Sequence, residues 1–200
     1  YTEDFVAEPA VTEAARRRGE QLGAPPVLPG TGAALRLLAA ACGAKTVVEV
    51  GTGAGVSGLW LFEGMAHDGV LTTIEIEPEY QRAAKSAFAA AGIAPQRARL
   101  IVGDALEVLP RLTDAAYDMA HIDGDKDDYP AYVEQAVRLL RPGGVLAVDN
   151  MLWHDKVADP AARDQTTTTL RDLGKRLRDD DRLICSLLPV GDGLLTAVRR

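Results

Sequence analysis

Short runs of β-branched and apolar residues recur along this chain, and longer segments with apolar residues at helical spacing separate them. The short runs predict strands at residues 46–50, 70–76, 99–102, 117–122, 145–148, 183–188 and 194–198. The longer segments predict helices at residues 11–22, 32–41, 56–66, 78–91, 105–112, 129–140 and 160–180. The sequence Arg-Pro-Gly-Gly at 141–144 predicts a turn before the fifth strand. This alternation of strands and helices is typical of an α/β fold.

The connections between the predicted strands indicate how the strands pair. Helical connections join the first five strands, as parallel crossovers require, whereas the turn between the last two is too short for a crossover and makes them antiparallel. We expect a Rossmann-like α/β fold with a seven-stranded sheet in the order 3-2-1-4-5-7-6, with strand 7 antiparallel and helices on both faces. Without a repeat or linker, residues 1–200 are expected to form a single domain, in which the helices of residues 1–43 cover the site and form a dimer contact.

Composition narrows the class of protein. With 47% hydrophobic and 26% charged residues the chain has the make-up of a soluble globular protein, and its net charge of −7 argues against general nucleic-acid binding. No apolar run approaches the roughly 20 residues that span a bilayer. The first residues are polar and acidic, unlike a signal peptide, and Cys42 and Cys185 lack metal-type spacing. We expect a cytoplasmic protein with reduced thiols that binds neither nucleic acid nor membranes.

The glycines that follow the first predicted strand mark a ligand site. Gly51, Gly53 and Gly55 stand between the strand at 46–50 and the helix that starts at residue 56. Glycine lets the backbone turn sharply and approach a ligand without a Cβ atom in the way. In an open α/β sheet, nucleotide-like ligands bind in the crevice at this place.

Two nucleotide classes fit this turn. The run Gly53-x-Gly55-x-x-Gly58 matches the dinucleotide fingerprint, which is a weak signal when it stands alone. Glu75 ends the second predicted strand 20 residues beyond Gly55, where it is placed to bind ribose hydroxyls. Both NAD enzymes and S-adenosylmethionine (SAM) enzymes use an acidic residue in this way. A glycine turn that binds no ligand is the third alternative.

Three features favour SAM. Glu49 lies inside the first strand just before the turn, as in the Glu-x-Gly-x-Gly loops of methyltransferases. The corner Gly103-Asp104-Ala105 at the end of the third strand suits an adenine amino group. A dehydrogenase normally carries a second domain for its substrate, and 200 residues leave no room for one.

Oxygen ligands follow two neighbouring strands of the predicted sheet. Asp123 ends the strand at 117–122, and Asp149 and Asn150 end the strand at 145–148. The carboxyl ends of parallel strands meet at one edge of the sheet, so these side chains can converge on a hard cation, Mg²⁺ above all, with Ca²⁺ and Mn²⁺ as alternatives. Lys126 can reach the same place, where a lysine beside a divalent cation can act as a base. A merely solvated acidic loop is the competing interpretation.

Side chains beside this cluster have less specific roles. His121 precedes Asp123 on its strand, and core packing is the expected role for it. Trp153 and His154 follow Asn150 in a loop, where they can line a substrate pocket. The sequence shows neither a Ser-His-Asp arrangement nor a reactive-cysteine context.

These stretches together resemble one enzyme family. The chain is similar to the cation-dependent O-methyltransferases, the caffeoyl-CoA O-methyltransferase family that shares its site with catechol O-methyltransferase, and most closely to short bacterial members. The resemblance covers nearly the whole chain and rests on residues 48–53, 74–78, 103–106, 122–129 and 148–153.

The resemblance implies a role for each site residue. It implies metal ligation by Asp123, Asp149 and Asn150, and catalysis by Asp123 with Lys126 as the base. It implies SAM contacts from Val27, Glu49, Gly51, Thr52, Gly53, Ser57, Glu75, Asp104, Ala105, Asp123, Asp125 and Tyr132. The products are a methyl ether and S-adenosylhomocysteine (SAH).

The resemblance also implies a small phenolic substrate with vicinal hydroxyls, and a homodimer. The apolar face of the first helix needs a partner surface, either a second copy or this chain's own sheet. A metal-independent methyltransferase, an NAD-binding oxidoreductase and a non-catalytic SAM-binding protein are the alternatives. The residues do not identify the methyl acceptor, its regiochemistry or whether an acyl-CoA ester is accepted.

Overall fold

A seven-stranded mixed sheet in the order β3-β2-β1-β4-β5-β7-β6 forms the centre of the computed structural model, which describes residues 1–200. The strands are β1 (Thr46–Val50), β2 (Val70–Glu75), β3 (Ala98–Val102), β4 (Tyr117–Ile122), β5 (Leu140–Val148), β6 (Leu183–Leu188) and β7 (Leu194–Arg199). The first five strands are parallel, and β7 pairs antiparallel with both β5 and β6. The predicted strand order and strand directions are confirmed.

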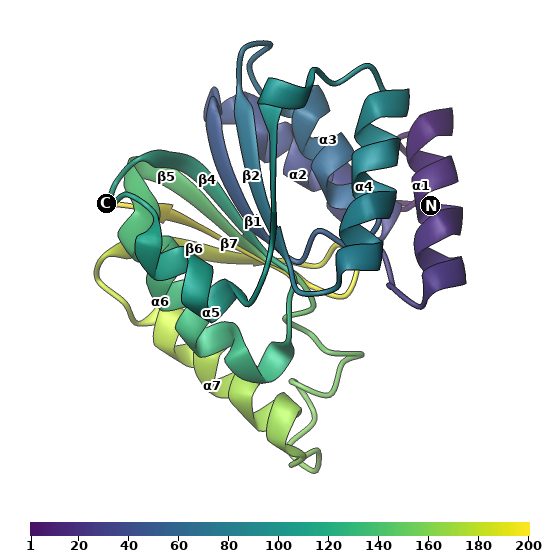
Figure 1. Cartoon of the computed structure of the whole chain (residues 1–200). Helices are drawn as coiled ribbons and strands as arrows, with labels where there is room; N and C mark the ends of the chain where they lie inside the picture. Colours follow the sequence, from purple (N-terminus) through teal and green to yellow (C-terminus); the bar gives the residue numbers. More distant parts are fainter.

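Helices cover both faces of the sheet (Figure 1). On one face lie α1 (Ala10–Leu22), α2 (Pro29–Ala41), α3 (Val56–Gly64) and α4 (Pro78–Ala90), and on the other lie α5 (Ala105–Val108), α6 (Tyr129–Leu139) and α7 (Gln165–Arg178). Short 3-10 helices occupy Pro95–Arg97, Leu109–Arg111 and Lys126–Asp128. Each face has its own apolar core. No helix has the length and apolar character that crossing a membrane requires.

The fifth strand differs from its prediction. The turn expected at 141–144 lies inside β5, which begins at Leu140. The pairing with β4 passes from Tyr117↔Leu140 to Met119↔Val145, so the extra residues of β5 form a bulge. Gly143 has a φ of 78° there, a left-handed conformation that glycine adopts without strain. A Pro-Gly-Gly sequence therefore bends this strand without ending it, and the predicted turn was wrong.

Several helix ends also differ from the predictions. Helix α2 begins three residues early because Pro29 occupies its first turn, where proline is favoured. Helix α7 begins at Gln165 instead of residue 160, because the Asp164 side chain accepts a hydrogen bond from the Thr167 N–H at 3.0 Å and caps the helix there. The predicted helix at 105–112 is a four-residue α-helix followed by a 3-10 turn.

Helix α1 has a partner surface within its own chain. It packs on α3 and α4, and Ala15 is buried in the core on that face. The α1–α2 loop that follows runs past the glycine turn.

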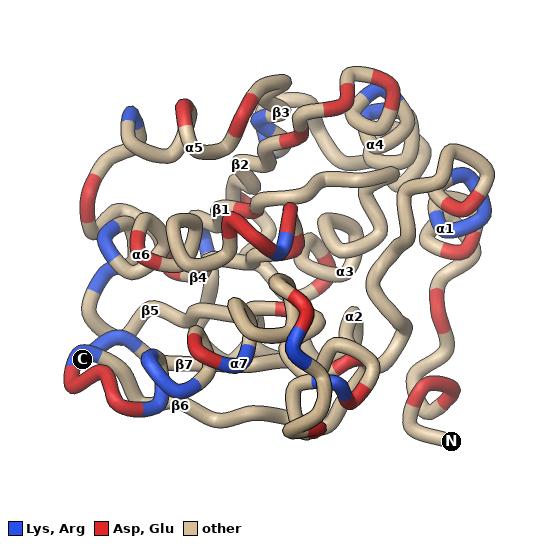
Figure 2. Tube along the Cα trace, turned by 90° about the horizontal axis from the view of Figure 1, so that it is seen from below, with Lys and Arg blue, Asp and Glu red and all other residues tan.

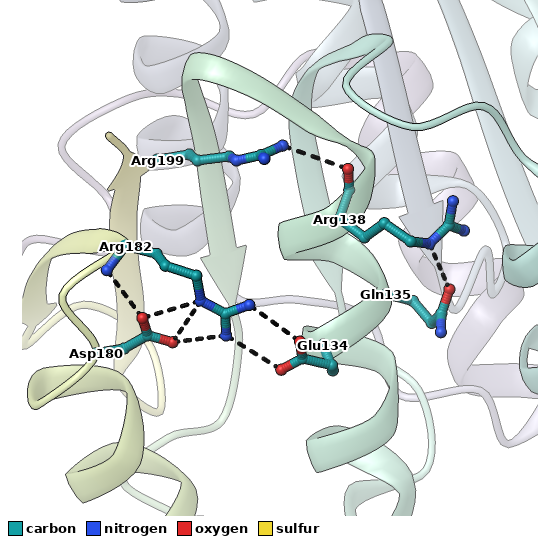
Figure 3. A network of polar contacts seen from close by, with 6 residues as sticks. All are labelled: Glu134, Gln135, Arg138, Asp180, Arg182 and Arg199. Atoms are coloured by element: carbon teal, nitrogen blue, oxygen red, sulfur yellow. Dashed lines mark hydrogen bonds and ion pairs between the residues drawn. The ribbon is translucent and has the colours of Figure 1, made fainter.

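Arg182 links the segment before β6 to helix α6 (Figure 3). Its guanidinium donates to Asp180 Oδ2 at 2.8 Å and to Glu134 Oε1 at 3.0 Å. These hydrogen bonds lower the pKa values of both the Glu134 and Asp180 carboxyls. A carboxyl with a lowered pKa stabilises the folded state above its unfolded pKa, and this stabilisation is lost as the pH falls through the folded value.

We therefore expect Arg182→Gln to lower the free energy of unfolding at pH 7 by about 1 kcal/mol, the upper range for exposed ion pairs. The difference in free energy of unfolding between the wild type and Arg182→Gln should shrink below about pH 4, where both carboxyls of the unfolded chain take up protons. Urea denaturation at pH 7 and pH 3 measures the difference. Arg111→Gln, at an exposed arginine with no ion pair, is the control. An equal deficit at both pH values would contradict the role given to the carboxylates.

Candidate active site

The glycine turn between β1 and α3 is packed against the end of β4. Gly51 has a φ of 90°, and a Cβ atom there would overlap the carbonyl oxygen of Asp123. Gly55 has a φ of 91° and precedes the first residue of α3. Any other residue at position 51 would push the ends of β1 and β4 apart, so the turn requires glycine there.

Glu75 holds this turn in place. Its Oε2 atom accepts a hydrogen bond from the Gly53 N–H at 2.8 Å, and its Oε1 atom accepts one from the Glu77 N–H at 3.1 Å. The residue is only 8% exposed. Because each carboxylate oxygen has more than one lone pair, Glu75 can also accept from a ligand's hydroxyls.

Two adjoining cavities, of about 270 and 190 Å³, lie at this edge of the sheet and share Glu75 as a common wall. Eleven of the twelve predicted cofactor residues line one or both of them: Val27, Gly51, Thr52, Gly53, Ser57, Glu75, Asp104, Ala105, Asp123, Asp125 and Tyr132. The loop of residues 24–27 forms the outer wall of the larger cavity. An elongated ligand fits such adjoining spaces, and we call the two cavities together the candidate cofactor pocket.

Glu49, the twelfth residue, lies behind the pocket wall and is fully buried. Its Oε2 atom accepts from Thr73 Oγ1 at 2.6 Å, and Thr73 Oγ1 is 2.6 Å from Thr52 Oγ1. Its Oε1 atom lies 3.2 Å from His121 Nδ1. Glu49 therefore contacts the pocket only indirectly, through its hydrogen bond with Thr73 and the hydrogen bond between Thr73 and Thr52. The sequence analysis missed Thr73, although it occupies the position on β2 directly opposite Glu49.

His121 has a polar partner in the core. Burial lowers its pKa, but the hydrogen bond and charge of Glu49 outweigh burial and leave the pKa raised. It joins β4 to β1, so it positions Glu49 in addition to packing in the core.

The predicted metal ligands lie at adjacent strand ends. Ile122 pairs with Val148, so Asp123 and Asp149 follow at neighbouring positions of β4 and β5. The Asp149 N–H donates to Ile122 O at 3.1 Å. Asn150 has a φ of 58°, which turns the chain, and its N–H donates to Asp149 Oδ1 at 2.8 Å. Figure 2 views the molecule from below Figure 1 and shows acidic segments near the ends of β1 and β4.

Lys126 lies over this cluster. Its Nζ atom donates to Asp123 Oδ1 at 2.8 Å and to Gly124 O at 3.1 Å, and it lies 5.1 Å from the centre of the Tyr129 ring. The side chains of Lys126 and Asp123 are each 17% exposed, so the pair is open to a ligand in the pocket.

The electrostatics of the cluster suit a cation. Burial, followed by the charge of Asp123, raises the pKa of Asp149 to about 7. The same two causes raise the pKa of Tyr129, whose hydroxyl is buried beside the two carboxylates. No three His, Cys, Asp or Glu side chains are grouped to bind a metal, so the candidate set consists of two carboxylates and the Asn150 amide. A divalent cation would compensate the second buried negative charge, and these oxygen donors fit one.

The loop after β5 is anchored by a residue that the sequence analysis did not single out. Asp192, between β6 and β7, accepts from the His154 N–H through Oδ1 at 2.7 Å and from the Leu152 N–H through its carbonyl at 2.9 Å. The rings of Trp153 and His154 lie with their centres 5.4 Å apart and their planes tilted by 33°. Asp192 comes close to this loop only in the folded chain, and no sequence pattern around residue 192 predicts the contact.

Comparisons with known proteins show the family to which the chain belongs. A sequence model described as O-methyltransferase matches residues 8–200. A relative from Mycobacterium avium (strain 104), whose name assigns it provisionally to the O-methyltransferases, is 53% identical over 199 residues, covering 100% of this chain and 90% of its own.

Two solved structures share the fold. The O-methyltransferase TomG from Streptomyces achromogenes, involved in tomaymycin synthesis and solved with SAM, has a TM-score of 0.88 and 31% identity, covering 99% of this chain and 93% of its own. An O-methyltransferase from Bacillus cereus, solved with SAH, has a TM-score of 0.88 and 27% identity, covering 100% of this chain and 94% of its own. The protein is an enzyme that transfers methyl groups from SAM to oxygen atoms of small molecules, and the chain belongs to the O-methyltransferase family.

Proposed function

We propose that this enzyme is a divalent-cation-dependent O-methyltransferase that methylates one of two vicinal hydroxyls on a catechol-like phenol. The observation that carries the proposal is the buried Asp149 beside Asp123, at the end of the pocket where Lys126 lies. Asp123, Asp149 and Asn150 would hold the cation, Mg²⁺ first among the hard cations. Two oxygens of a vicinal diphenol could then replace two of its waters.

The cofactor pocket supports a placement for SAM. Glu75 would bind the ribose hydroxyls, and Asp104 and Ala105 would bind the adenine in the smaller cavity. Val27 and Ser57 would contact the methionine end in the larger cavity, which also reaches Asp123 and Lys126. This orientation would place the methionine end of SAM beside Asp123 and Lys126.

The chain's own residues do the proton chemistry in this proposal. A phenol has a pKa near 10 and is a weak nucleophile at pH 7. When bound, the cation would lower the pKa of a coordinated phenol, and SAM would supply an electrophilic methyl group. Asp123 accepts a hydrogen bond from Lys126 Nζ at 2.8 Å and so positions the amine. A divalent cation held at Asp123 would favour the neutral amine, which can accept the phenol proton. The pocket walls hold donor and acceptor in line, which supplies much of the acceleration.

A methylation assay over vicinal diphenols and matched monophenols, with and without EDTA, tests this function. We expect methyl ether products from the vicinal diphenols alone, loss of activity in EDTA, and recovery when excess Mg²⁺ is added. Activity that EDTA leaves unchanged would identify a metal-independent methyltransferase. Equal activity on monophenols would contradict the proposed acceptor class.

Replacing Glu75 with alanine should weaken SAM binding by about 1–3 kcal/mol, because the ribose hydroxyls and the Gly53 N–H lose their acceptor. Calorimetric titration with SAH measures the change. Glu75→Gln keeps one acceptor oxygen and should lie between the wild type and Glu75→Ala. Unchanged affinity in Glu75→Ala would rule out this placement of the ribose.

We also propose that the protein is a homodimer, as the family resemblance suggests. The edge strand β6 exposes Ile184 and Leu187, which are 56% and 47% accessible in the single chain. Exposed apolar residues on an edge strand favour association. Light scattering should give about twice the chain mass of 21.3 kDa at micromolar concentrations. A mass near that of one chain would refute the dimer.

A further inference from the structure

A third cavity lies outside the cofactor pocket, between helix α4 and the edge strand β3. Its volume is about 530 Å³, larger than either cofactor cavity and within the range of small-molecule sites. Apolar side chains supply most of its surface: Pro78, Phe88, Ile93, Pro95, Leu100 and Val102. None of the residues that line it lines the cofactor cavities. We refer to it as the α4–β3 groove.

The groove contains a buried polar group without a partner. Gln81, on α4, is only 7% exposed, and its Nε2 atom is buried with no hydrogen-bond acceptor. The buried amides of folded proteins nearly always have a partner, because an unpaired donor loses the hydrogen bonds it would make to water. Gln81 lines the groove, and a rotation of its terminal amide would present this donor to an acceptor on a ligand bound there.

Two cations stand beside this amide on the same helix. Arg82 and Lys85 also line the groove, both are exposed, and neither forms an ion pair. The neighbouring Glu79 is engaged with Arg18 at 3.7 Å. In a chain with a net charge of −7, two unpaired cations beside an apolar groove favour a ligand of negative charge.

We propose that the α4–β3 groove binds an amphipathic anion, a compact apolar chain or ring that carries one carboxylate or phosphate. The apolar body lies on Phe88 and Leu100, and the anionic head is bound by Arg82, Lys85 and the amide N–H of Gln81. The apolar residues supply affinity by burial from water, and the cations and the amide select the charge of the head group. This site is separate from the one that performs methyl transfer.

Calorimetric titration of the SAH-saturated protein tests the site, since SAH fills the cofactor pocket. Octanoate and octyl phosphate are the probes, and octanol and octylamine are the controls of equal chain length. We expect saturable binding of at least one anion, at least 10-fold tighter than either control. Comparing the two anions distinguishes a carboxylate ligand from a phosphate ligand. Absence of anion binding, equal binding of octanol, or displacement of SAH by octanoate would overturn the proposal.

Variants locate the bound anion. The double variant Arg82→Ala/Lys85→Ala and the variant Gln81→Leu should each weaken binding of the tighter anion at least 5-fold while leaving SAH affinity unchanged, which also shows that they fold. Arg111→Ala, at an exposed and unpaired arginine among the elements of the opposite face of the sheet, should have no effect. Full binding in the double variant would place the anion elsewhere. If Leu100→Glu instead converted a dimer into a monomer, the groove would be an interface between copies and the proposal would fail.

Discussion

Asp149→Ala is expected to abolish methyl transfer while leaving SAH affinity within about twofold of the wild type. Asp149 does not line the cofactor cavities, but it supplies one of only two carboxylates in the proposed cation site. Its loss leaves one carboxylate and an amide, too few ligands to hold Mg²⁺ at ordinary concentrations. Turnover assays with a Mg²⁺ titration, together with SAH calorimetry, measure both effects.

Two further variants show whether the effect is specific to Asp149. Asp123→Ala should impair both turnover and cofactor binding, because Asp123 also lines the larger cavity and orients Lys126. Asp172→Ala, at an exposed carboxylate on α7, should behave as the wild type. Full activity of Asp149→Ala, or of the wild type in excess EDTA, would show that the acidic cluster binds no catalytic cation.

Lys126→Ala is expected to lower kcat by about 10²–10⁴, the usual contribution of a positioned base, without changing the Mg²⁺ requirement. Part of the loss should be recovered at high pH, where the coordinated phenol, whose pKa the cation would lower from its ordinary value near 10, ionises without a base. The pH profile of kcat for both proteins measures this recovery.

Lys175→Ala, which removes an exposed lysine on α7, is the matched control and should retain full activity. A loss in Lys126→Ala that stayed constant across the pH range would contradict a role in proton removal. It would indicate that Lys126 acts only by holding Asp123 in place.

The strands and their directions were predictable because each strand is a short apolar run and each connection has a characteristic length, and the order of the sheet was expected from the usual arrangement of such folds. The placement of Asp123, Asp149 and Asn150 was predictable because these residues directly follow such runs. Neighbouring strands in a parallel sheet end at one edge, so sequence position alone places these residues at the same edge, whereas their role as cation ligands stays a prediction.

Other features depend on contacts that no local pattern records. The bulge in β5 depends on how closely Gly144 approaches the backbone of β4 at Asp118, and a turn and a bulge have similar sequences. Whether Glu49 faces the ligand or the core depends on the register that sets it opposite Thr73 and His121. Asp192 reaches His154 across 38 positions of the chain. Contacts between residues so far apart in the sequence form only when the helices and strands pack together, so local sequence patterns do not predict them.

The contact of Gly51 with the carbonyl of Asp123 has a consequence for engineering this enzyme. The glycine turn of the candidate cofactor pocket and the backbone of Asp123, the proposed cation ligand, touch with no space between them. A larger residue at position 51, introduced to alter cofactor preference, would therefore displace the end of β4 and is expected to lower methyl transfer. Screens for new donors should leave this glycine unchanged and vary the α1–α2 loop, which forms the outer wall of the cofactor pocket.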